Sequence, residues 1–189
     1  MAHKEQWAFC GKVRGLYSQH FNNKKVLDIG SFDVNGNNRF LFKDCDFTGL
    51  DIGEGDGVDV VCPAQEYDAP DETYDTIISC ECWEHNPYYV ESIQNAVRML
   101  KSGGLFLFTC ATTGRAVHGV SYLDEKCAAE CDTWVTLPNV KKENWDNDYY
   151  KNITEEDIRE SVEVDNIFSS YEFEVEENHC DLFFWGIKK

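Results

Sequence analysis

The sequence is short of positive charge. It has 17 Lys and Arg residues against 35 Asp and Glu residues, which gives a formal net charge of −18. Such a surface repels phosphate backbones and disfavours a nucleic-acid partner. The chain has no apolar run near the ~20 residues of a membrane span, so no membrane partner is expected. Its first residues, "MAHKEQWAFC", lack the apolar stretch of a secretory signal, which favours a cytoplasmic location.

The nine cysteines include no CxxC pair. An odd number of cysteines without a secretory signal indicates reduced thiols rather than a disulfide framework. Cys80 and Cys82 form a CxC pair, and Cys127 and Cys131 stand four apart, with His118 nearby in the sequence. A zinc site stays an alternative, but the two-pair spacing typical of such sites is absent. We therefore expect no metal from the cysteine pattern.

What is present fits one α/β domain over residues 1–189. Hydrophobic residues make up 42% of the chain, and there is no repeat, low-complexity tract or linker. Apolar runs typical of buried strands alternate with segments of helical spacing. The expected strands are 25–29, 47–52, 58–62, 74–80 and 105–110, and the expected helices are 7–21, one between Asn86 and Gly103, and one after Thr154. This alternation predicts a mostly parallel, Rossmann-like sheet with helices on both faces, and segments 171–176 and 182–187 predict an antiparallel hairpin at the end.

In such sheets a ligand binds at the carboxyl ends of the strands. The loops "GSFDVNG", "GEGDG" and "ECWEHNP", after the first, second and fourth strands, should therefore surround one site. A dinucleotide loop would read G-x-G-x-x-G, but Phe32 and Asn35 stand where its second and third glycines would be. No Walker loop occurs either. A close phosphate cradle is therefore disfavoured.

Two strand-end carboxylates indicate a ribose-bearing ligand without a pyrophosphate. Asp51 ends the second strand about 20 residues after Gly30, where an acid commonly binds ribose hydroxyls. S-adenosylmethionine (SAM) fits this requirement, and its cationic groups would suit Asp28, Asp51 and Glu81. The alternative is that Asp28 and Asp51 only cap local turns.

At this point the segments "VLDIGSFDVNG", "GLDIGEGDGVDVV", "YDTIISCECWEH" and "VRMLKSGGLFLFT" resemble, in order and spacing, the class I SAM-dependent methyltransferases. The "DVNG" and "GDGVDVV" stretches resemble a subgroup of small bacterial and phage methyltransferase-like proteins. The resemblance covers about residues 24–112. It implies a seven-stranded sheet with the last strand antiparallel, SAM as cofactor and methyl transfer as the activity.

The resemblance also implies roles for individual residues. Asp51 should hold the ribose hydroxyls, Ile52 should lie against the adenine, and Cys80 and Glu81 should lie beneath the methionine and methyl group. Pro63 stands where family members often carry an acid for the adenine amino group. The full set expected to bind the cofactor is Asp28, Gly30, Ser31, Phe32, Asp51, Ile52, Ala64, Gln65, Cys80 and Glu81.

A methyl acceptor that loses a proton needs a base with a pKa near neutral. His85 and His118 are the candidates because each follows a strand that ends at the site, although either could be a structural histidine. Residues 111–150 carry several aromatics and are expected to form a lid on the acceptor side. The expected activity is methylation of a small molecule or glycan.

Three other functions stay open at this stage. One is a catalytically silent protein that binds SAM or a nucleotide. A nicotinamide-dependent oxidoreductase is disfavoured by the missing glycines. "NPYY" at 86–89 is similar to the Asn-Pro-Pro-Tyr of DNA amino-methyltransferases, but it lies five residues beyond the strand and lacks the second proline. The acceptor and the oligomeric state stay open.

Overall fold

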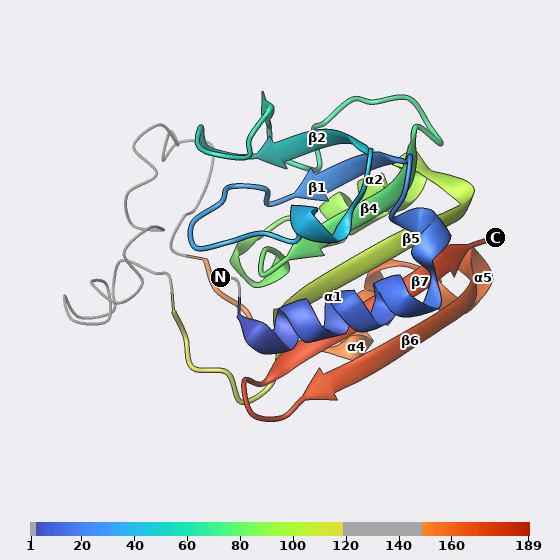
Figure 1. The fold of residues 1–189 in the computed structure, drawn as a ribbon. Coiled ribbons are helices and arrows are strands. Elements are labelled where there is room, and N and C mark those ends of the chain that lie inside the picture. The colour runs from blue at the N-terminus through green and yellow to red at the C-terminus, as the bar shows by residue number, and fades with distance from the viewer. Residues whose placement is uncertain (1–2, 119–148) are drawn as a thin grey trace.

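The computed structural model describes residues 3–118 and 149–189. Its centre is a seven-stranded sheet in the order β3-β2-β1-β4-β5-β7-β6 (Figure 1). The strands are β1 Lys25–Ile29, β2 Asp46–Asp51, β3 Val60–Val61, β4 Tyr74–Cys80, β5 Leu100–Ala111, β6 Phe168–Glu176 and β7 Asp181–Lys188. Strands β1 to β5 are parallel, and β7 lies antiparallel between β5 and β6. The predicted mixed sheet is confirmed, and the carboxyl ends of β1, β2 and β4 meet at one edge.

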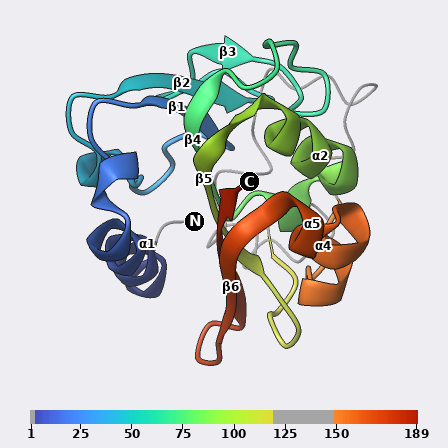
Figure 2. The same cartoon turned by 90° about the vertical axis from the view of Figure 1, so that its right-hand side faces the viewer.

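Helices cover both faces of the sheet, as predicted. Figure 2 shows α1 (Lys4–Leu16) on one side, and α2 (Tyr89–Met99), α4 (Glu155–Ser161) and α5 (Val164–Ile167) on the other. Three short 3-10 helices complete the connections: η1 Ser18–His20, η2 Arg39–Leu41 and η3 Trp83–His85. The predicted cap of α4 is present, since the Thr154 side chain accepts from the Asp157 amide and Asp157 accepts from the Thr154 amide.

The central strands contribute to two hydrophobic cores because their side chains alternate between the faces. On β5, Phe106 and Phe108 pack beneath α2 and α4, whereas Leu105 and Leu107 pack beneath α1. The same alternation on β7 sends Phe184 to the first core. The buried strands of the sheet thus explain the continuous apolar runs in the sequence.

Several element boundaries differ from the prediction. α1 ends at Leu16 because the chain then turns into η1. α2 begins at Tyr89 and ends at Met99, not at Gly103, because Leu100 is already extended and pairs with Tyr74 in the sheet. β3 has only two residues, since β2 pairs with it only at its last two positions.

Parts of two expectations lie outside the described residues. Most of the 111–150 lid is among them, and so are Cys127 and Cys131. The described cysteines are free, and the described groups of His, Cys, Asp and Glu close enough to share a metal contain no cysteine.

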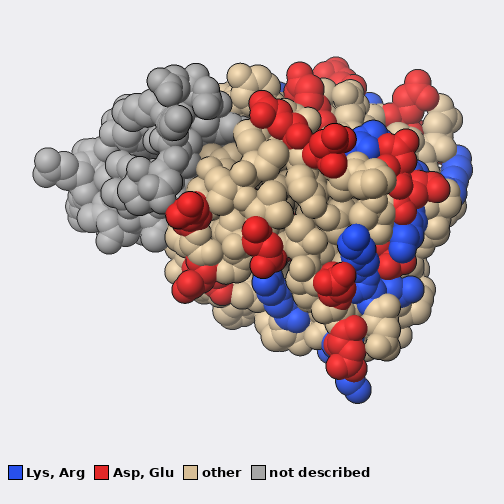
Figure 3. All heavy atoms as spheres, turned by 90° about the horizontal axis from the view of Figure 1, so that it is seen from above, with Lys and Arg blue, Asp and Glu red and all other residues tan. Residues whose placement is uncertain are grey.

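The surface in Figure 3 shows Asp and Glu spread over the visible face, with Lys and Arg gathered mainly on the side away from the grey atoms. Both signs of charge are therefore present on this face, although the net charge of the chain is −18. Within residues 3–118 and 149–189, no helix combines the length and apolar character needed to cross a bilayer.

Phe184 is the central aromatic side chain of the larger core, and we expect its removal to destabilise the fold. It is 1% exposed, and its ring lies 5.0 Å from that of Phe108 and 4.7 Å from that of Phe173. Phe184→Ala should lower the free energy of unfolding by about 3–5 kcal/mol, measured by urea denaturation. Phe40→Ala is the control, since Phe40 is 65% exposed. Equal effects of the two changes would contradict this description of the core.

Candidate active site

A pocket opens at the carboxyl edge of the sheet, where the loops after β1, β2 and β4 meet. The structure brings together seven of the ten predicted cofactor residues in its wall: Asp28, Gly30, Ser31, Phe32, Asp51, Cys80 and Glu81. The other lining residues were not in the predicted set; they are Gln6, Val34, Asn35, Gly36, Asn37, Asn38 and Ile78. The remaining three predicted residues, Ile52, Ala64 and Gln65, are not part of this wall.

Gly30 is required by the shape of the first loop. Its φ is +76°, and a Cβ added there would lie 2.8 Å from both Cβ and Sγ of Cys82. A side chain would therefore be strained by its backbone and would also collide with the loop after β4. The glycine thus lets two loops of the pocket approach each other closely.

Phe32 occupies the position of the missing second glycine. Its ring lies so close to Gly55 that a Cβ on Gly55 would be 2.1 Å from a ring carbon. The ring therefore packs on the loop after β2 as well as lining the pocket. This packing fills space that a pyrophosphate-binding loop leaves to the ligand.

Asp51 binds the backbone of its own and the neighbouring loop. Its Oδ2 accepts from the Phe32 amide at 3.1 Å, and its Oδ1 accepts from the Gly53 amide at 3.3 Å. Burial raises the pKa of this carboxyl, and the backbone hydrogen bonds oppose that rise. The local capping considered as an alternative is therefore present, but each carboxylate oxygen keeps a second lone pair for a ligand.

Asp28 is held beside Arg39. The Asp28 Oδ2 atom lies 3.5 Å from Arg39 Nε, while Arg39 Nη2 donates to the Gly57 carbonyl at 2.6 Å. Burial raises the pKa of Asp28 to about 6, although Arg39 acts to lower it. Arg39 thus links the acid at the end of β1 to the loop after β2.

The "DVNG" stretch divides into a turn-forming residue and pocket residues. Asp33 accepts hydrogen bonds from the Gly36 amide, at 2.7 Å, and from the Asn37 side chain. This pattern shapes the turn, in which Gly36 has a φ of +119°. Asn35 and Gly36 line the pocket, whereas Asp33 does not.

A buried hydrogen-bond chain connects α1 to Glu81 across the pocket. Asn38 Nδ2 donates to Gln6 Oε1 at 3.4 Å, and Gln6 Nε2 donates to Thr109 Oγ1 at 3.3 Å. Thr109 in turn donates to Glu81 Oε1 at 2.8 Å. Neither Gln6 nor Asn38 lies in a recognisable motif: the packing of α1 against the sheet brings Gln6 here, and the loop between β1 and η2 brings Asn38.

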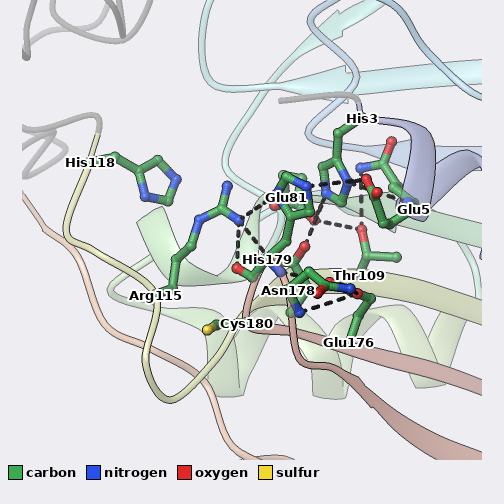
Figure 4. Close-up of polar contacts among 12 residues, drawn as sticks. His3, Glu5, Glu81, Thr109, Arg115, His118, Glu176, Asn178, His179 and Cys180 are labelled. Carbon is green, nitrogen blue, oxygen red and sulfur yellow. Dashed lines mark hydrogen bonds and ion pairs between the residues drawn. The ribbon is translucent and has the colours of Figure 1, made fainter.

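Glu81 follows β4 in an unusual backbone conformation, with a φ of 55°. Its burial opposes ionisation, but a neighbouring His3 ring and the Thr109 hydroxyl lower its pKa to about 2. His3 has its own pKa raised to about 10 by Asp181 and Glu81, against the effect of burial. Figure 4 shows His3 and Glu81 pointing toward each other beside Thr109. Glu81 is therefore ionised at neutral pH.

The two predicted catalytic histidines lie together. The rings of His85 and His118 are 5.0 Å apart, and the Tyr150 ring lies 5.4 Å from the first and 4.9 Å from the second. Burial lowers the pKa of His85 to about 3 and also lowers the pKa of His118. His118 is only partly buried, and its Nδ1 lies 3.0 Å from the Ala116 carbonyl oxygen. A neutral His118 can donate from Nδ1, which leaves Nε2 as the basic nitrogen of the ring.

The similarity of "NPYY" to a base-binding motif has a local explanation. Asn86 is 2% exposed, and its side chain accepts from the Tyr88 amide at 2.7 Å and donates to Ser92 at 2.9 Å. The amide group therefore holds the start of α2. These local hydrogen bonds explain the asparagine of "NPYY" without a nucleic-acid ligand.

Glu84 joins this histidine pair and was not predicted. It is completely buried, neither carboxylate oxygen has a hydrogen-bond partner in the described part of the chain, and it lies within metal-sharing distance of His85 and His118. Burial, with a smaller contribution from Glu81, raises the pKa of Glu84 to about 8. The group is therefore largely protonated at neutral pH.

The raised pKa of Glu84 predicts that stability falls as the pH rises. The ordinary pKa of 4.5 applies to the unfolded chain and about 8 to the folded one, so between these values only the folded chain keeps the proton. The free energy of unfolding should decrease across this window by at most about 1.4 kcal/mol per pH unit. Thermal unfolding from pH 5 to 8 should show a shallower decline for Glu84→Gln than for the unchanged protein. The exposed Glu91→Gln is the control, and parallel slopes for all three proteins would refute the assignment.

Comparison with known proteins agrees with this architecture. Residues 27–108 match the family model of the methyltransferase domain. No curated protein sequence matches the chain significantly. Among solved structures, 1,6-didemethyltoxoflavin-N1-methyltransferase from Burkholderia thailandensis, with S-adenosylhomocysteine bound, has a TM-score of 0.60 at 15% identity, covering 98% of this chain and 77% of that one.

Two further structures share the fold. Phosphoethanolamine N-methyltransferase 2 from Haemonchus contortus, in complex with SAM, has a TM-score of 0.62 at 16% identity over 97% of this chain, which spans only 52% of that protein. The YcgJ protein from Bacillus subtilis has a TM-score of 0.61 at 13% identity, covering 99% of both chains. Residues 27–108 thus match the model of a methyltransferase domain, and the seven-stranded sheet has the fold of these solved methyltransferases.

Proposed function

We propose that the chain transfers the methyl group of SAM to a small-molecule acceptor, with the cofactor held in the pocket at the carboxyl edge. The observation that carries this proposal is the meeting of Gly30, Asp51 and Glu81 in one wall, each from the end of a different strand. A glycine turn, a ribose-binding acid and a buried anion are the groups that an adenosyl amino acid with a cationic sulfur requires.

The proposed orientation of SAM follows from the two ends of this wall. Asp51 accepts the ribose hydroxyls through the lone pairs that its backbone hydrogen bonds leave free. Asp28 and the ionised Glu81 provide negative potential for the ammonium and sulfonium groups. Ser31 offers a buried hydroxyl oxygen with no hydrogen-bond partner among the described residues. Ile52, Ala64 and Gln65 stay predictions for the adenine end.

The acceptor class rests on the related folds and on the absence of an obvious polymer-binding feature in the sequence. One similar structure is named for methylation of 1,6-didemethyltoxoflavin and another for methylation of phosphoethanolamine, both small molecules. The net charge of −18 disfavours nucleic acid. Glycans form the second acceptor class that the sequence predicts, and cytoplasmic location stays part of the proposal.

His118 is the better of the two candidate bases. Methyl transfer is an in-line displacement, for which the enzyme mainly provides proximity and orientation. An oxygen acceptor must also lose a proton, and the partly buried His118 has a basic Nε2 to take it when Nδ1 donates to Ala116. The pKa of His85, about 3, is too low for efficient proton uptake near neutral pH. His85 and Tyr150 are then positioning residues around the His118 ring.

Binding calorimetry tests the cofactor site. SAM and S-adenosylhomocysteine should bind with one site per chain, whereas NAD should not bind. Asp51→Ala should weaken SAM binding by about 1–3 kcal/mol, or roughly 5–150-fold, because it removes the ribose hydrogen bonds. Glu54→Ala is the control, since Glu54 is exposed on the same loop. Unchanged affinity in a folded Asp51→Ala protein would remove Asp51 from the site, and no binding of SAM or its product at millimolar concentration would overturn the enzyme assignment.

Turnover tests the acceptor class and the base. Panels of small hydroxylated or amino compounds and of oligosaccharides are incubated with SAM, and release of S-adenosylhomocysteine is measured. A small molecule should give the highest rate, and His118→Gln should lower kcat by about 100-fold or more with an oxygen acceptor. SAM binding should be unaffected by this change. Tight SAM binding without turnover on any acceptor would instead favour the catalytically silent alternative.

A further inference from the structure

Three ligand-bearing side chains from distant parts of the chain meet beside the pocket. His3 precedes α1, Glu81 follows β4, and Asp181 begins β7. The atoms that each could offer to a metal lie within 4.8 Å of one another. Glu81 is 3% exposed and Asp181 is fully buried. We refer to these three residues as the His3 cluster.

The contact between the protonated His3 and Asp181 is an ion pair that lacks the geometry of a hydrogen bond. The distance between His3 Nε2 and Asp181 Oδ2 is 3.0 Å, yet neither atom has a hydrogen-bond partner of acceptable geometry within the described residues. Two ligands bound to one metal at ~2.1 Å lie roughly 3.0–3.5 Å apart, and neither points at the other. The spacing therefore fits two ligands directed at a common centre, where a metal ion would replace the proton that His3 Nε2 otherwise carries.

Glu81 completes the set of candidate ligands. Its Oε1 is 3.9 Å from His3 Nε2, and its Oε2 is buried with no partner among the described residues. A fully desolvated carboxylate oxygen without a partner costs free energy unless a cation or donor reaches it. The positive φ at this residue, 55°, shows that the chain holds it in an uncommon conformation.

The surrounding residues resemble the outer shell of a metal site. His3 Nδ1 lies 3.3 Å from Glu5 Oε2, and His179 Nε2 lies 3.2 Å from the same oxygen. A metal-binding histidine characteristically donates its second ring N–H to a carboxylate in this way. The Gln6 amide also donates to His3 Nδ1, at the longer distance of 3.4 Å. This hydrogen bond is lost when Nδ1 carries a proton and donates it to Glu5.

The carboxylates of Glu81 and Asp181 are each held by a neighbouring side chain as well. Thr109 donates to Glu81 Oε1 at 2.8 Å, and Arg115 Nη1 lies 3.5 Å from Asp181 Oδ1. Figure 4 shows Glu5, His179, Thr109 and Arg115 converging around His3 and Glu81. Each candidate ligand is therefore fixed by a second residue, which a functional metal site requires.

We propose that His3, Glu81 and Asp181 bind one divalent transition-metal ion. One imidazole nitrogen and two carboxylates suit Mn²⁺, Fe²⁺, Co²⁺ or Zn²⁺, whereas Mg²⁺ and Ca²⁺ prefer oxygen ligands alone. The two carboxylates balance the charge of the ion. With three protein ligands the ion keeps at least one open position for water or another oxygen ligand.

The location gives this ion a route to the pocket. Glu81 belongs both to the His3 cluster and to the pocket wall. An oxygen atom of a bound molecule could therefore occupy the open position. The metal site itself rests on the cluster geometry, and Glu81 is the one residue of the cluster that lines the pocket.

The test uses the full chain without an affinity tag, freed of metal by a chelator. Calorimetric titration with Mn²⁺, Co²⁺ and Zn²⁺ should show one site per chain for at least one of these ions, and Mg²⁺ should bind at least 10-fold more weakly. Bound Co²⁺ should give a visible absorption spectrum that reports nitrogen and oxygen ligands. His3→Gln and Asp181→Asn should each weaken binding at least 10-fold, with folding checked by circular dichroism. Glu5→Gln should weaken it less, because Glu5 acts through His3.

A second group of possible ligands provides the control. Glu84, His85 and His118 also lie within metal-sharing distance of one another. His118→Gln should leave metal affinity unchanged if the ion binds at the His3 cluster. Loss of binding in that variant, unchanged binding in a folded His3→Gln protein, or no binding at millimolar metal would each overturn the proposal. SAM affinity is measured on the same samples. A protein that binds SAM but no metal contradicts only the metal site, whereas a protein that binds metal but no SAM contradicts only the cofactor site.

Discussion

The close approach of the loop after β1 to its two neighbours is the constraint on which the site depends. Gly30 and Ser31 both donate to the Leu50 carbonyl, at 2.9 and 3.2 Å, and so attach this loop to the end of β2. The lack of a side chain at Gly30 lets Cys82, from the loop after β4, pack directly against it. The three loops are thereby held as one unit, and Asp51 and Glu81 keep fixed positions relative to each other.

The second determinant of the site is α1, which brings polar side chains to an edge otherwise formed by strand ends. Gln6 lies in the middle of a hydrogen-bond chain from Asn38 to Glu81. His3 lies one turn earlier and faces the same carboxylate. The helix and its N-cap residue therefore supply both the buried amide that orders the pocket and the imidazole of the His3 cluster. Its other buried residues, such as Phe9 and Val13, anchor it to the sheet.

The sequence predicts the sheet well because the signals are local. Each parallel strand is buried on both faces and reads as an apolar run, and the carboxyl ends of β1, β2 and β4 follow from alternation with helices. Asp51 and Glu81 could be assigned to the site because they directly end or follow such runs. The length of β3 could not be predicted, since it depends on how many residues of β2 remain free to pair.

Residues that reach the site through tertiary packing could not be found in this way. Gln6 and Asp181 carry no local signal, because their positions depend on how α1 and β7 pack against β5. Glu84 stood next to the predicted His85, but its complete burial does not follow from its residue type. Ala64 was assigned from the resemblance and stays a prediction for the adenine end; in the fold it is buried in the core, and its carbonyl accepts from the Asn95 side chain.

The position of β7 has a consequence for the order in which the molecule can be completed. Although it comes last in the sequence, β7 lies inside the sheet and separates β5 from β6. Until it is inserted, β5 has a free edge with buried aromatics such as Phe106 and Phe108 beside it. Asp181 reaches Glu81 only when this insertion is complete. A ribosome-bound chain can thus assemble the β1–β4 half of the pocket early, while the His3 cluster forms only as the final strand is placed.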